Sequence, residues 1–248
     1  MSRWADERRA KMARMLTVGF LLVRPVLRPS YVSAQLIPNE VISASDCICP
    51  QFPGPYAISW CETPADDRAS LLTAAGVPHE LHGRAIEWAT SVFGEVFGWP
   101  GVFYTAEAAR EAKAQFLSYA ESVKIIGLGL PEEFATEFVS EATPPTSPPG
   151  YAPSGESGYL ECLKRTNQLP LGGRILGFEP LNLQLGMLED SWLCNGLEQH
   201  CALKLQIYPS ANGLVSSAEE AIRCCAEIDR DEVGAEPGPW YPFLLVEY

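Results

Sequence analysis

The sequence predicts an α+β or mixed α/β protein, with strand–helix–strand units arranged around a mixed sheet. Two observations carry this prediction. Short apolar or alternating runs recur along the chain, and stretches with the start signals of helices separate them. With 248 residues, 47% of them hydrophobic and 20% charged, the chain is long enough to bury a sizeable core.

The N-terminal segment differs in charge from the rest of the chain. Its apolar run 15–23 (MLTVGFLLV) follows a basic stretch and is too short to span a bilayer. A signal peptide and a start codon placed too far upstream both produce this outline, and Arg24 and Arg28 disfavour the signal peptide. We therefore expect residues 1–28 to be a non-core extension, outside the folded body.

The next segments predict two strands followed by two helices. The runs 31–37 and 56–60 have the composition of strands. Thr63, followed by a proline, is a good helix N-cap, and the helix should end at Gly76. Apolar residues on one face predict a second helix around 85–93.

A strand–helix–strand unit should follow. The run 98–104 leads out of a turn into a short strand, and Thr105 can cap a helix. The run 123–130 (VKIIGLGL) is apolar enough for a central strand. The stretch 131–142 starts with a proline and acidic residues, as a short helix prefers.

A proline-rich segment divides the chain. Residues 144–157 are rich in Pro, Gly and Ser, which predicts a loop or linker rather than regular structure. The segment separates an α/β region at 30–143 from a second α/β region at 158–248. We expect the two regions to pack together as one body.

The second region repeats the same kinds of element. A strand is predicted at 174–186, a helix at 191–201 (SWLCNGLEQHC) and a strand at 203–209. Ser217 begins a capping box that starts a further helix, and 240–248 predicts a final strand.

The two regions share a short internal echo. The segments 100–109 (PGVFYTAEAA) and 212–221 (NGLVSSAEEA) have Gly, Ala, Glu and Ala at matched positions. An internal duplication would explain this match, but so would the residue types that any strand-to-helix corner needs. Four identities favour the second explanation, and the duplication stays an open alternative.

The cysteine pattern indicates a reducing compartment. Eight cysteines could form four disulfides, but Cys47 and Cys49 are one residue apart, and Cys224 and Cys225 are adjacent within a helical pattern. A chain of this length does not need disulfides to hold a core. We expect reduced, mostly buried thiols and a cytoplasmic protein.

The stretch SWLCNGLEQHC contains a possible nucleophile, Cys194, and a possible base, His200. On a helix their six-residue spacing turns the side chains by about 600°, which places them on opposite faces unless Gly196 breaks the helix. Cys194, Leu197 and Cys201 share one face, as in an apolar core stripe. The cysteine and histidine spacings do not match those of zinc sites, so no metal or cofactor is expected. A combination in space with Cys47 and Cys49, which are distant in sequence, stays open.

The candidate binding residues are mostly tryptophans near the ends of predicted elements. Aromatic side chains there can line a groove, although they also close the edges of cores. The residues that we expect in a binding site are Trp99, Trp192, Asn195, Glu198 and Trp240.

The charge of the protein excludes some partners. The net charge is −13, and beyond residue 28 the chain has 11 basic and 29 acidic residues, a net charge of −18. Binding to nucleic acid or to anionic lipid requires clustered lysines and arginines, which this part of the sequence lacks. We expect no nucleic acid and no membrane as partner, and a basic protein suits the charge better.

Two segments of the sequence resemble segments of other proteins. The strings SWLCNGLE (191–198) and PGPWYPFLLVEY (237–248) resemble stretches of uncharacterised bacterial proteins, which pair a Ser-Trp-Leu-Cys-Asn-x-Leu-Glu segment with a Trp-x-Pro C-terminal strand. The resemblance would cover the chain from about residue 30 onward. It implies a bacterial protein and carries no activity over to any residue.

Together these observations predict a non-catalytic, acidic protein-binding module of a bacterial cytoplasm, of the immunity or inhibitor type. The alternative is a small-molecule enzyme, a hydrolase for example, with a groove near Trp192, Glu198 and Trp240. Only three histidines are present, and the carboxylate pairs fall at helix starts, where the helix dipole explains them. Both facts favour the binding module.

Overall fold

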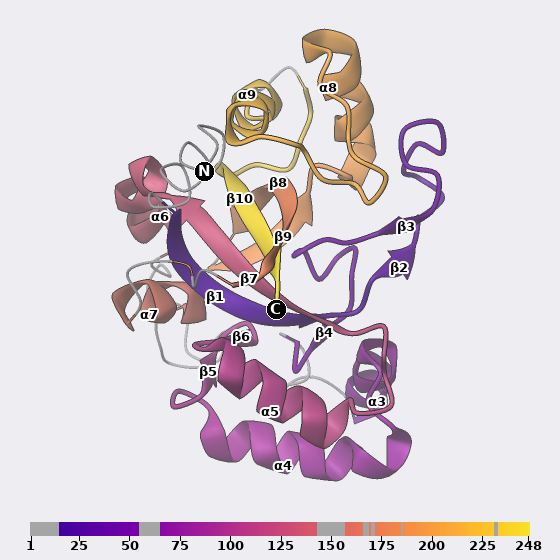
Figure 1. The fold of residues 1–248 in the computed structure, drawn as a ribbon, viewed down its shortest axis with the longest axis vertical. Coiled ribbons are helices and arrows are strands. Elements are labelled where there is room, and N and C mark those ends of the chain that lie inside the picture. The colour runs from indigo at the N-terminus through magenta and orange to yellow at the C-terminus, as the bar shows by residue number, and fades with distance from the viewer. Residues whose placement is uncertain are drawn as a thin grey trace.

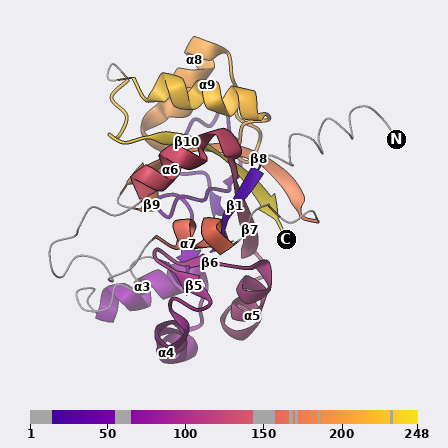
Figure 2. The ribbon, with the colours of Figure 1, turned by 90° about the vertical axis from the view of Figure 1, so that its left-hand side faces the viewer.

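The computed structural model describes residues 15–54, 65–142, 157–165, 169, 172–184, 186–230 and 233–248. Over these residues the protein has the expected α+β fold, with an eight-stranded sheet, a separate two-stranded sheet and helices around them (Figure 1). In Figures 1 and 2, α8 and α9 lie at one end of the molecule and α4 and α5 at the other, with the strands between them.

The strands are β1 (Met15–Val23), β2 (Val26–Leu27), β3 (Glu40–Val41), β4 (Gln51–Phe52), β5 (Phe97–Gly98), β6 (Val102–Phe103), β7 (Lys124–Pro131), β8 (Arg174–Gln184), β9 (Met187–Ser191) and β10 (Trp240–Glu247). The α-helices are α3 (Ala65–Ala75), α4 (His82–Val92), α5 (Ala106–Phe116), α6 (Ala135–Ala142), α7 (Gly158–Arg165), α8 (Leu197–Leu205) and α9 (Ala218–Ile228). The 3₁₀ helices are η1 (His79–Leu81), η2 (Glu132–Phe134) and η3 (Cys194–Gly196).

The large sheet has the order β5–β6–β1–β7–β10–β8–β9, and β4 pairs with the end of β1. The strand pairs described in this sheet are antiparallel, whereas the sequence led us to expect a mixed sheet. Because β7 pairs with β10, the regions 30–143 and 158–248 contribute to the same sheet.

Strand β1 corrects the predicted N-terminal boundary. The run 15–23 does not lie outside the core: it pairs with β7 along its whole length, and every residue of β1 except Leu16 is buried. A central strand that is covered on both faces has a continuous apolar sequence, which is the same pattern that suggested a leader segment. Residues 1–14 lie outside the described residues.

Two predicted strands are wrong and one is not described. Residues 31–37 form turns, and 203–209 begins as the end of α8 and continues without strand structure. The run 56–60 lies outside the described residues. The strand β7 and the helices α5 and α9 begin and end close to the predicted positions.

The two strand–helix–strand units match each other closely. The hydroxyls of Thr105 and Ser217 cap α5 and α9, and each accepts a hydrogen bond from the backbone N–H three residues on, at 3.1 and 3.2 Å. Both helices have 11 residues. Just before each helix, a short extended segment pairs with a long strand, through Phe103 with Phe20 of β1 and through Val215 with Phe178 of β8.

A glycine at a bulge occupies the same place in each unit. Gly19 of β1 has φ 152° and Gly177 of β8 has φ 148°, and each follows a break in the strand register. A Cβ on Gly19 would lie 2.1 Å from Cγ1 of Val102, and one on Gly177 would lie 2.9 Å from Cβ of Leu214. Val102 and Leu214 are matched positions of the sequence echo, so the close approach is the same in both halves.

The pairing of the central strands completes the symmetry. Leu128 of β7 lies opposite Gly19, and Leu245 of β10 lies opposite Gly177. Leu128 and Leu245 also pair with each other, so a pseudo-twofold axis passes between them. This arrangement supports an internal duplication. The residue types that any strand-to-helix corner needs would explain the matched helix caps, but they would not explain the matched bulges and strand registers.

The first prediction concerns the bulge glycine of β1. Gly19→Ala should lower the free energy of unfolding by more than about 2 kcal/mol, because the added Cβ meets Val102 and the backbone is in a region that favours glycine. Gly83→Ala is the matched control: Gly83 lies on α4 with no atom near its Cβ position, so this change should be neutral or stabilise by up to about 1 kcal/mol. Urea unfolding measures both, and equal effects would contradict the packing described here.

The second prediction concerns β1 as a whole. Deletion of residues 1–28 removes a central strand and should abolish cooperative unfolding or lower the thermal midpoint by more than about 10 °C. Leu21→Ala within β1 should cost about 2–5 kcal/mol, because Leu21 is 1% exposed. Thermal melts followed by circular dichroism test both changes. A truncated chain with the full-length midpoint would place β1 outside the core.

Candidate functional site

The buried carboxylate of Glu179 joins the loop 42–49 to the large sheet. Its Oε1 accepts hydrogen bonds from Ser43 Oγ at 2.6 Å and from Ser191 Oγ at 2.7 Å. Its Oε2 accepts one from the backbone N–H of Ala44 at 2.8 Å. These short distances are typical of hydrogen bonds to an ionised group.

The two serine hydroxyls extend this network to the backbone. Ser43 Oγ accepts the N–H of Ser45 at 3.0 Å, and Ser191 Oγ accepts the N–H of Leu193 at 3.2 Å. The loop 43–45 and the turn after β9 are therefore both held by Glu179. We call Glu179, Ser43, Ala44 and Ser191 the Glu179 network.

Burial raises the pKa of Glu179 to about 7, since the three hydrogen bonds only partly offset the loss of hydration. The matched position in the first half of the protein, two residues after Gly19, is Leu21, which is also buried. The fold therefore accepts an apolar side chain at this position, and of the two matched positions only the one in the second half carries a carboxylate. Our sequence reasoning missed Glu179, although a lone acid within an apolar strand was a visible signal.

Three potential metal ligands converge beside this network. The Sγ atoms of Cys47 and Cys194 are 3.9 Å apart, and a carboxylate oxygen of Asp190 lies within 4.8 Å of both. Cys47 is exposed, Asp190 is half-buried and Cys194 is buried. We call these three residues the Cys–Cys–Asp cluster. Sequence spacing missed the cluster because its two cysteines are 147 residues apart.

The contacts in the cluster set the ionisation of its members. A hydrogen bond from the Cys194 thiol lowers the pKa of Cys47. The same contact and burial raise the pKa of Cys194. Burial and then the charge of Glu236 raise the pKa of Asp190. Cys47 is therefore the thiol of this pair that ionises first, and it is the one that solvent reaches.

The sequence predicts one helix for the stretch SWLCNGLEQHC, and this prediction is wrong. Ser191 ends β9, and the last two residues of η3, Asn195 (φ 55°) and Gly196 (φ 74°), have left-handed backbone that kinks the chain before α8. The glycine permits this kink, which a helical periodicity alone does not reveal. Cys194, Leu197 and Cys201 are nevertheless buried, as the apolar stripe predicted.

The possible nucleophile and base of this stretch do not meet. His200 Nε2 lies 2.9 Å from Glu227 Oε1 of α9, and Cys194 lies against Cys47. The other two histidines are close to each other, with their ring centroids 5.1 Å apart. The ring of His82 also contacts the carbonyl of Val77 at 3.1 Å.

The candidate binding residues have different surroundings. Trp192 is fully buried and donates from Nε1 to the carbonyl of Gly213, and Trp240 is 5% exposed. Glu198 is fully buried and accepts the N–H of Ser33 at 3.0 Å.

The other two candidates are more accessible. Asn195 is exposed at the kink, and Trp99 is half-buried in the turn after β5, where its carbonyl accepts the N–H of Gly158. Trp192, Asn195 and Glu198 are neighbours in the sequence, but only Asn195 is exposed, and Trp99 lies beside the start of α7. A role of the five residues in binding stays a prediction.

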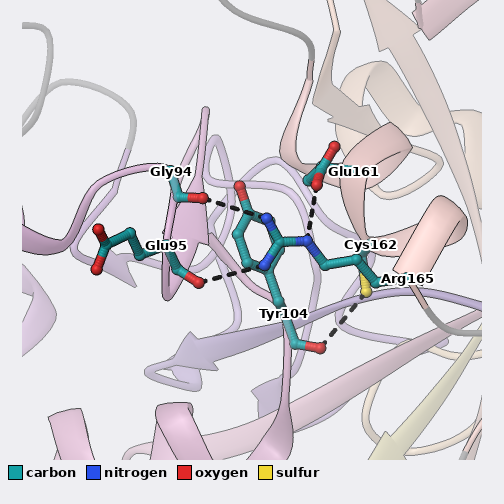
Figure 3. Close-up of polar contacts among 6 residues, drawn as sticks. All are labelled: Gly94, Glu95, Tyr104, Glu161, Cys162 and Arg165. Carbon is teal, nitrogen blue, oxygen red and sulfur yellow. Dashed lines mark hydrogen bonds and ion pairs between the residues drawn. The ribbon is translucent and has the colours of Figure 1, made fainter.

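A second polar cluster surrounds Arg165 at the end of α7 (Figure 3). Its guanidinium lies 4.2 Å from the centroid of the Tyr104 ring and donates to the carbonyls of Gly94 and Glu95, both at 3.3 Å. Its Nε donates to Glu161 at 2.7 Å. Because these contacts engage both the face and the edge of the guanidinium, the cluster holds α7 to the loop after α4 and serves the fold.

An acidic surface lies on η2 and α6. Four glutamates on it are exposed, and we call this surface the α6 acidic face: Glu132, Glu133, Glu137 and Glu141. On the same helix, Phe138 is fully buried and packs edge-on against Tyr241 and Phe243, with ring centroids 5.4 and 5.9 Å apart.

Comparison of the chain with protein-family models, with curated proteins and with solved structures finds no match. In the part of the chain that the structure describes, no helix combines the length and the apolar character needed to cross a bilayer. The structure itself defines the class: an antiparallel α+β protein with a pseudo-twofold sheet and with a thiol–carboxylate cluster in which Cys47 is exposed.

The third prediction concerns Glu179. Its folded-state pKa of about 7 lies above the ordinary value of 4.5, so the folded chain holds this proton more tightly than the unfolded chain. The stability that protonation contributes is complete below pH 4.5 and is lost as the pH rises through about 7. Glu179→Gln should remove this part of the pH dependence, on the order of 1–3 kcal/mol between pH 5 and 8.

Urea unfolding at both pH values, for both proteins, measures this difference. Glu121→Gln, at an exposed position, is the control and should keep the wild-type pH dependence. If Glu179→Gln also keeps it in full, Glu179 does not titrate as described.

Proposed function

We propose that the protein is a non-catalytic, acidic protein-binding module of the immunity or inhibitor type, which acts in a bacterial cytoplasm. In this proposal it binds a basic protein partner, and the α6 acidic face is the surface that makes the contact. The observation that carries the proposal is the arrangement of charge on that helix.

The helix dipole does not explain the whole of this arrangement. Glu132, Glu133 and Glu137 lie in first turns, where acidic side chains stabilise a helix. Glu141 lies in the last turn, where the dipole disfavours an acid, and it follows Glu137 by four residues, a spacing at which like charges cost about 0.2–0.5 kcal/mol. Among the described residues, no ion pair neutralises either side chain. A basic partner would relieve the repulsion between Glu137 and Glu141, and this relief would add to the free energy of binding.

The helix presents these charges on a rigid support. Phe134 and Phe138 of this segment both pack edge-on against Tyr241 of β10, so η2 and α6 are fixed to the sheet while the four glutamates stay exposed. Little ordering is then required on binding, which favours affinity. Complementary charge also speeds the encounter with a basic partner.

The enzyme alternative has less support from the residues on which it was based. A groove near Trp192, Glu198 and Trp240 would need these side chains at a surface, and all three are buried. The thiol-hydrolase version would need Cys194 and His200 to meet, and His200 contacts Glu227 instead.

The fourth prediction tests the proposed surface by charge reversal. Immobilised protein should retain a basic protein from an extract of the native host at low salt and release it at high salt, because the contact is electrostatic. The double variant Glu137→Lys/Glu141→Lys should weaken this binding at least tenfold. Mass spectrometry identifies the protein, and calorimetry with the purified partner measures the affinity.

The control carries the same change in net charge at the other end of the molecule. Glu87→Lys/Glu111→Lys alters exposed positions on α4 and α5 and should bind like the wild type. If both double variants lose the partner equally, net charge rather than the α6 acidic face is responsible. If neither loses it, the proposed surface is wrong.

A further inference from the structure

We propose that the Cys–Cys–Asp cluster binds a thiophilic divalent cation of the zinc class, with Cys47, Cys194 and Asp190 as the protein ligands. This site is separate from the α6 acidic face and does not depend on the function proposed for it. The proposal rests on the geometry of the donors, on the charge around them and on how the Glu179 network holds them.

The spacing of the donor atoms fits a tetrahedral metal ion. With metal–sulfur bonds of about 2.3 Å, two thiolates on one tetrahedral zinc are about 3.8 Å apart. The sulfurs of Cys47 and Cys194 are 3.9 Å apart, and the Asp190 oxygen lies within 4.8 Å of each. Thiolate sulfur combined with a carboxylate oxygen favours zinc over magnesium or calcium, which prefer oxygen ligands alone.

The charge of the surroundings favours a cation. Two thiolates and one carboxylate carry up to three negative charges, and Glu189 and Glu236 lie close enough to interact electrostatically with Asp190. Among the described residues, no ion pair neutralises these three carboxylates. A divalent cation would offset this repulsion.

The ligands are held in place by groups outside the cluster. Ser43 and Ala44 anchor the loop that leads to Cys47, and both bind Glu179. Ser45 Oγ, two residues before Cys47, donates to the backbone carbonyl of Glu189, next to Asp190. Ser191, which follows Asp190, binds the same carboxylate of Glu179. Such supporting contacts fix the ligands of metal sites and raise their affinity.

The number of ligands and the exposure of Cys47 define the kind of site. Closed structural zinc sites use four protein ligands, whereas three ligands leave one position for an exchangeable group. Because Cys47 is exposed, that position would face solvent. A water molecule, or a side chain of another protein, could then complete the coordination.

The fifth prediction tests the site with cobalt(II), whose spectrum reports its ligands. Titration of the reduced full-length protein with Co²⁺ should produce a thiolate-to-cobalt charge-transfer band that saturates at one equivalent. Zn²⁺ should displace the cobalt and abolish the band, and competition with a chromogenic chelator gives the zinc affinity. This measurement uses the wild-type chain, so it does not depend on the folding of any variant.

Variants assign the ligands. Cys47→Ala should lose the band, and Asp190→Asn should weaken binding at least tenfold. Cys49→Ala is the matched control: it removes a thiol from the same loop, but Cys49 is buried and its Sγ contacts the carbonyl of Val41, so metal binding should stay as in the wild type. Circular dichroism confirms that each variant is folded.

Three results would overturn the proposal. The first is the absence of a charge-transfer band in the reduced wild-type protein. The second is a band that persists in folded Cys47→Ala. The third is a reduced protein that binds no metal but forms a disulfide between Cys47 and Cys194 when a thiol oxidant is added, which would make the pair a redox couple instead.

Discussion

The arrangement of the site depends on one buried carboxylate. Glu179 is completely removed from solvent, and a carboxylate in such a place is stable only when donors surround it. Ser43, Ser191 and the N–H of Ala44 are those donors, and they come from two segments that are distant in sequence. The requirement for hydrogen bonds at Glu179 therefore fixes where the loop 42–49 crosses the sheet. Cys47 and Cys194 come together as a consequence.

The pseudo-twofold frame shows which parts of the protein the fold itself requires. The helix caps at Thr105 and Ser217, the bulge glycines and the central leucine pair recur in both halves, so they belong to the common architecture. Glu179 has no such counterpart, because Leu21 occupies the matched position in the first half. The acid at position 179 is therefore a feature that the pseudo-twofold frame does not require.

Local signals in the sequence predicted the parts of the fold that local interactions determine. The hydroxyl caps of α5 and α9 and the apolar strand β7 could be predicted because a few neighbouring residues specify each of them. Strand β1 was missed because its apolar run, with basic residues before it, has the composition of a leader segment. Only its pairing with β7, more than 100 residues away, distinguishes the two. The Cys–Cys–Asp cluster was missed for the same reason, because Cys47 is 147 residues away from Cys194 in the sequence. The stripe of Cys194, Leu197 and Cys201 was predicted correctly as buried, but the kink at Gly196 was not, because a glycine permits a break without requiring one.

The position of β10 has a consequence for how the chain folds during synthesis. This strand is the last of the sheet to leave the ribosome, yet it lies between β7 and β8. Until it arrives, β7 has a partner only on the β1 side, and β8 has none on the side that β10 will occupy, so two strand edges remain open. Open edges pair readily with other chains. A chain that stopped before β10 would keep both edges open and would therefore be prone to aggregate.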